Sequence, residues 1–140
     1  MNYVRIVLAG VAGTVAYFAL GGLVFGLLPQ LRESYRMYPA VYRNQEGIKS
    51  VMPLGMLGML LSIVVLAAIY ALAYHGGPGL WEGARFGFLI GVFALGAFVL
   101  HNYVNLNIGL RLTGQQAVAY LMEWLVVGIV IGLVYRPALP

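Results

Sequence analysis

The chain contains 140 residues, of which 62% are hydrophobic and only 9% are charged. A soluble domain carries roughly 25% charged residues, so this chain cannot cover a water-exposed surface and is predicted to be an integral membrane protein. The absence of cysteine excludes disulfides and thiolate metal sites. The net charge of +4 comes from basic residues near the ends of hydrophobic segments, a pattern that indicates orientation in a membrane and not nucleic-acid binding.

Four hydrophobic segments define the predicted fold. They cover residues 4–28, 51–74, 86–110 and 115–135, and each is long enough to cross a bilayer as a helix. A longer connection, residues 30–50, joins the first segment to the second. The sequence therefore predicts an all-α fold, an antiparallel up-down four-helix transmembrane bundle that forms a single domain over residues 1–140.

Proline, glycine and segment length set the predicted boundaries. The first apolar run, residues 6–28, exceeds the ~7–15 residues of a signal-peptide core, so it is expected to be retained as a span. Pro53 is placed in the first turn of the second span, where a missing N–H is harmless. The run at residues 75–79, HGGPG, then ends that span.

The connection over residues 30–50 mixes basic and aromatic side chains. A short helix is expected to begin at Pro39 and to end before Gly47. Such a composition suits the headgroup region, which favours an interfacial anchor over the alternative of a substrate or partner site. The residues assigned to the membrane interface are Arg32, Tyr35, Arg36, Tyr38, Tyr42 and Arg43, with Trp81 at the opposite interface.

The charges and glycines carry two further expectations. Five basic residues lie on the face of the long connection and three on the opposite face, so the positive-inside rule places both termini outside the cytoplasm. Glycines recur at a spacing of four residues in or beside the first, third and fourth spans. Because helices in lipid pack closely at such positions, they predict tight packing within the bundle or between copies.

A polar run interrupts the third span and defines the candidate site. Counting along the spans places His101 nine residues and Glu123 eight residues from the long-connection face, roughly 13 Å and 12 Å deep. The predicted buried cluster contains His101, Asn102, Asn105, Tyr120 and Glu123, with Tyr17 and Ser62 within about two turns of the same level. These residues either hold the bundle together or line a cavity for a proton, an ion or the head of an amphipathic ligand.

Other chemistries find little support in the sequence. His75 lies in a turn at the opposite face, so it cannot share a haem with His101, although a single axial ligand at His101 stays open for a haem or chlorophyll-type pigment. Hydrolase and phosphate-loop motifs are absent, and too few His and carboxylate side chains share one depth for a metal site. The expectation is therefore no catalytic residue, no metal and no cofactor.

The stretches YPAVYRNQEGIKSVMPLG and WEGARFGFLIG resemble families of small, uncharacterised four-span bacterial membrane proteins. The resemblance implies a multi-pass protein of the bacterial inner membrane and carries over no catalytic residue. Small multidrug exporters are similar in size, but their essential acid lies in the first span, and this first span contains none.

Three functional hypotheses follow. The first is a non-enzymatic accessory or scaffold subunit, or a binder of a lipid-like ligand beside the polar cluster. The second is a small proton- or ion-coupled transporter or channel that uses His101 and Glu123. The third is haem or pigment binding through His101. The expected partners are membrane lipid and a second copy or a larger membrane complex, with no nucleic acid.

Overall fold

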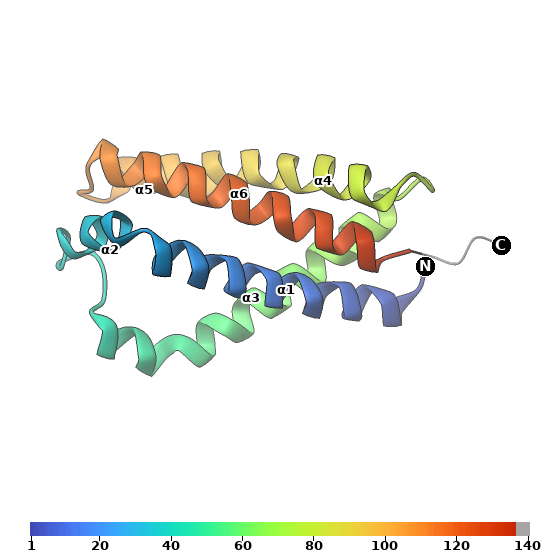
Figure 1. Cartoon of the computed structure of the whole chain (residues 1–140), viewed down its shortest axis with the longest axis horizontal. Coiled ribbons are helices and arrows are strands. Elements are labelled where there is room, and N and C mark those ends of the chain that lie inside the picture. The colour runs from blue at the N-terminus through green and yellow to red at the C-terminus, as the bar shows by residue number, and fades with distance from the viewer. Residues whose placement is uncertain (137–140) are drawn as a thin grey trace.

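The computed structural model describes residues 1–136, and every regular element in that range is helical. Four long helices run antiparallel, and each is long and apolar enough to cross a membrane (Figure 1). This confirms the predicted all-α four-helix fold of a small multi-pass membrane protein. The elements are α1 (Tyr3–Leu27), α2 (Pro29–Arg36), α3 (Gln45–Ala73), α4 (Gly79–Ala94), the π-helix η1 (Leu95–Leu100), α5 (His101–Asn105) and α6 (Leu110–Val134).

Three of the spans begin earlier than predicted. Polar residues that the sequence suggested would lie in loops form the first turns of α3, α4 and α6. At α3, the Asn44 side chain accepts a hydrogen bond from the Gly47 N–H at 2.8 Å, an N-cap that starts the helix six residues before Val51. The predicted short helix at Pro39 is wrong, because the short helix is α2 and begins at Pro29.

The third span is continuous but not uniform. It consists of α4, η1 and α5, and the π-helical turns between Leu95 and Leu100 shift the face on which the following residues lie. The helix ends at Asn105 and not at Leu110 as predicted. Residues 106–109 then form the turn into α6.

The closest helix–helix contact joins α4 to α6 through glycine. A methyl group built on Gly83 or Gly87 would collide with backbone atoms of α6, and one on Gly128 would collide with the backbone of both α4 glycines. Gly79 and Gly132 meet in the same way one turn further along. The glycine spacing therefore serves contact within the chain, as close backbone approach in lipid requires.

α1 packs between α6 and α3. Its Gly10 lies against Val64, and its Gly13 lies against Ile63 of α3 and Val127 of α6. The main core of the bundle continues from these contacts toward the end at which α1 begins and α6 ends (Figure 1). There Tyr70, Tyr74, Phe86 and Tyr135 pack edge to face or tilted, with ring centroids 5.3 Å to 6.1 Å apart.

Toward the opposite end, α3 leaves the bundle. Every residue from 48 to 58 is exposed, and methyl groups built on Gly55 and Gly58 would meet open space. Pro53 lies inside α3 and not in its first turn, so the N–H that would bond to the carbonyl of residue 49 is missing. The helix bends in this region and passes away from α1, as Figure 1 shows.

Candidate functional site

One face of α6 bears polar side chains at the end of the bundle where α3 no longer packs against the other helices. Gln116, Tyr120 and Glu123 follow the helical spacing of Val127 and Ile131, which contact α1 and α3 deeper in the bundle. At the level of Val127, Ile63 of α3 closes the bundle. At the level of Gln116, α2 and the segment after it take the place of α3.

Gln116 holds this cover in place. Its Nε2 donates hydrogen bonds to the hydroxyls of Tyr35 at 3.1 Å and Tyr42 at 3.0 Å, and the two tyrosine rings pack edge to face. A second contact runs from the Gly109 N–H to the Tyr38 hydroxyl at 2.9 Å. Three of the tyrosines that the sequence assigned to the membrane interface thus bind the turn before α6 and the first turns of that helix.

Tyr35 has an altered acidity as a result. Burial raises its pKa to about 12, and the hydrogen bond from Gln116 opposes this rise. The hydroxyl accepts a hydrogen bond from Gln116 and keeps its own proton available to a further acceptor.

Glu123 lies one level deeper and is only 8% exposed. Tyr17 of α1 lies near its carboxyl group, and a methyl group on Gly21 would lie 3.4 Å from Glu123 Oε1. The ring of Tyr17 packs against Trp124 with centroids 5.6 Å apart. Glu123 is thus a buried carboxyl group with Tyr17 nearby and Tyr120 one turn away on α6.

Of the predicted cluster, the structure brings together Tyr17, Tyr120 and Glu123. It leaves His101 and Asn105 exposed, with Asn102 half-buried, so the predicted meeting of His101 with Glu123 is wrong. Asn105 instead donates to the His101 carbonyl at 2.9 Å. Ser62 is also exposed and donates to the Gly58 carbonyl at 2.9 Å.

The reason lies in the helix ends. His101 is only four residues from the end of α5, whereas Glu123 is thirteen residues from the start of α6. At ~1.5 Å per residue these positions are about 6 Å and about 20 Å from the turn, so the two residues differ in depth by more than two helical turns. The π-helix further changes the face on which His101 lies.

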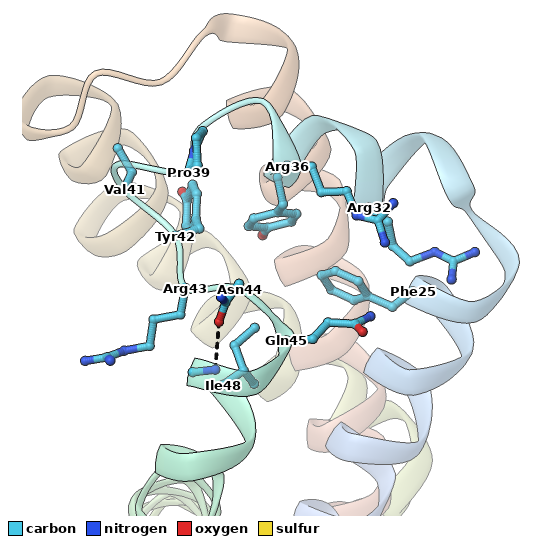
Figure 2. Close-up of a pocket in the computed structure, with 12 residues that line it drawn as sticks. Phe25, Arg32, Arg36, Pro39, Val41, Tyr42, Arg43, Asn44, Gln45 and Ile48 are labelled. Atoms are coloured by element: carbon cyan, nitrogen blue, oxygen red, sulfur yellow. Dashed lines mark hydrogen bonds between the residues drawn. The ribbon is translucent and has the colours of Figure 1, made fainter.

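An open cavity of about 1110 Å³ lies between α2, the end of α1 and the start of α3. Figure 2 shows Arg32 of α2 and Arg43 of the connecting segment extending on opposite sides of it, with Phe25 of α1 between them. Among the described residues that line it, no side chain is acidic. They are Phe25, Arg32, Tyr35, Arg36, Pro39, Val41, Tyr42, Arg43, Asn44, Gln45, Gly47 and Ile48.

The cavity and the polar face of α6 share one wall. Tyr35 and Tyr42 line the cavity with one side and accept from Gln116 with their hydroxyls. Sequence reasoning found these tyrosines but missed Gln116 and Phe25. The spacing of Gln116, Tyr120 and Glu123 on one helical face was the available signal.

Comparison with protein-family models, with curated proteins and with solved structures finds no match to this chain. The fold and the site by themselves define its class: a small four-span membrane protein with a cation-rimmed cavity at one end of the bundle.

Proposed function

We propose that this protein is a non-enzymatic membrane protein that binds an anionic, lipid-like amphiphile in the cavity between α1, α2 and α3. The observation that carries the proposal is the rim of three arginines on a cavity with aromatic and aliphatic walls. It refines the lipid-binding hypothesis drawn from the sequence.

The charges at the rim favour an anion. Arg32 and Arg36 lie one helical turn apart on α2, and Arg43 extends from the facing side (Figure 2). Positive side chains on both sides of a cavity favour a phosphate or carboxylate group, which accepts charge-assisted hydrogen bonds from arginine. The three arginines follow the apolar part of α1 or precede that of α3, a position that supports contact with lipid headgroups.

The walls favour an amphiphile over a free anion. Phe25, Val41 and Ile48 supply apolar surface, and Tyr35 and Tyr42 supply rings with polar hydroxyls. The volume of about 1110 Å³ slightly exceeds the ~300–1,000 Å³ usual for ligand pockets, which leaves room for a headgroup and the first part of a chain.

Removal of the three rim charges tests the proposal. The probes are dioleoyl phosphatidylglycerol (anionic) and dioleoyl phosphatidylcholine (zwitterionic), titrated into the purified protein in mild detergent and followed by native mass spectrometry. We expect Arg32→Gln/Arg36→Gln/Arg43→Gln to weaken phosphatidylglycerol binding tenfold or more, since each cation contributes about 1 kcal/mol to anionic-lipid attraction.

Arg111→Gln is the matched control. Arg111 is exposed near the start of α6, at the same end of the bundle, and does not line the cavity. Its removal should leave the affinity within about twofold of the wild type. Equal losses in the triple variant and in Arg111→Gln would reduce the effect to general surface charge and would overturn the proposal.

A further inference from the structure

One face of α3 leads from the cavity toward the core of the bundle. Ile48 lines the cavity, and Met52, Met56 and Met59 follow it at spacings of three and four residues. The next position in this series, Ile63, is fully buried against α1. Residues at such spacings share one helical face, so the three methionines face the side of α3 that looks toward the bundle.

Exposure along α3 agrees with this assignment. Met52 and Met56 are 46% and 47% exposed, whereas Leu54, on the opposite face, is 74% exposed. Met59, nearer to Ile63, already packs against the main core. The face is therefore an inner wall that α3 uncovers as it diverges from the bundle.

Methionine is suited to a wall that accommodates a flexible chain. Its side chain is unbranched and polarisable, so it adapts to apolar groups of irregular shape. The Met-lined wall of α3 follows directly after the cavity-lining residue Ile48. The surface therefore changes from charged at Arg43 to apolar at Ile48 and Met56. This order matches that of an anionic lipid from headgroup to acyl chain.

We infer that the Met-lined wall of α3, Met52, Met56 and Met59, binds the acyl chain of the lipid whose anionic headgroup the cavity holds. The inference rests on the proposed function and names its ligand class more closely. The ligand is a membrane lipid with an anionic head and a long chain, and water-soluble phosphates or short-chain analogues bind weakly. Continuity with the arginine-rimmed cavity favours this occupant over a second copy of the chain.

Chain length is the direct test. Dioleoyl and dihexanoyl phosphatidylglycerol share a headgroup, and each is titrated into the full-length protein below the micelle-forming concentration of the short-chain lipid, with native mass spectrometry as readout. We expect the long-chain lipid to bind the wild type at least tenfold more tightly. Equal affinities would overturn the acyl-chain inference and leave the headgroup site intact.

Met56→Trp locates the chain. The indole should obstruct the wall and weaken long-chain binding fivefold or more, with no change for the short-chain lipid. Leu54→Trp, on the outer face two residues away, is the control and should change neither. The same loss in both variants would contradict the inference, as would a stable dimer of the wild type that Met56→Trp converts to monomer.

A measurement on the wild type avoids any dependence on variant folding. Phosphatidylglycerol with a photoreactive diazirine in its acyl chain should label peptides that contain residues 48–59. Labelling confined to other helices would overturn the inference. If the wild type did not prefer phosphatidylglycerol to phosphatidylcholine, or if the triple arginine variant bound phosphatidylglycerol as tightly as the wild type, the proposed function itself would be contradicted.

Discussion

Gly128→Leu is expected to prevent the bundle from folding. Gly128 lies directly against Gly83 and Gly87 of α4, and a side chain there would meet backbone atoms, which cannot rotate away. Overpacking of an adaptable core costs about 1–3 kcal/mol, and a clash with backbone exceeds that range. Because α4 and α6 form the most extensive contact of the fold, their separation should expose the protein to aggregation in detergent.

The measurement is the yield of monodisperse protein in size-exclusion chromatography and its thermal unfolding midpoint in mild detergent. Gly58→Leu is the control, since a methyl group built on Gly58 would meet no atom within 4 Å. It should match the wild type in both readouts. If Gly128→Leu gave folded protein with an unchanged midpoint, the α4–α6 glycine contact would be refuted.

Gln116→Leu has the second large expected effect, which falls on α2 and the following segment. The substitution removes two hydrogen bonds that hold Tyr35 and Tyr42 to α6. At about 1 kcal/mol for each bond, the covering segment should open roughly tenfold or more frequently. Hydrogen–deuterium exchange of peptides that cover residues 29–44 should accelerate by that factor, while peptides from the centre of α4 should not change.

The neighbouring residue provides a matched control. The Oε1 atom of Gln115 is buried without a hydrogen-bond partner among the described residues, so Gln115→Leu removes no bond to the tyrosines. It should leave the exchange of residues 29–44 as in the wild type. Equal acceleration in both variants would show that Gln116 does not tether the segment.

Hydrophobic patterning was sufficient to predict the four spans and their antiparallel order. The recurrence of glycine also predicted tight packing, and the structure assigns that packing to α4 and α6. Both features depend on local composition and on the length needed to cross a bilayer, which a sequence displays directly. The single-domain organisation and the orientation in the membrane stay predictions.

The helix ends were harder to predict. Helix α3 begins before Val51 because Asn44 caps it. Its first turns consist largely of polar residues that precede the apolar segment, so hydropathy did not reveal them. The π-helix at Leu95–Leu100 leaves no mark in hydropathy, yet it and the early end at Asn105 move His101 out of the predicted cluster. A depth count that starts at the wrong residue misplaces every side chain after it.

The polar centre was partly predictable. Tyr17, Tyr120 and Glu123 were grouped from the sequence because a carboxyl group in an apolar span must find polar neighbours, and in the structure all three are at least partly buried. The cavity depends on the departure of α3 from the bundle, and that path results from Pro53 and from tertiary contacts of α2 that no periodicity encodes. The histidine-based transporter and pigment hypotheses gain no support from the exposed position of His101.

The most direct test of the account is lipid selectivity of the wild-type protein. The protein is extracted in mild detergent, mixed with equimolar dioleoyl phosphatidylglycerol and dioleoyl phosphatidylcholine, and examined by native mass spectrometry. An arginine-rimmed cavity predicts one phosphatidylglycerol retained per chain in strong preference to phosphatidylcholine. Equal retention of the two lipids, or retention of neither, would contradict it.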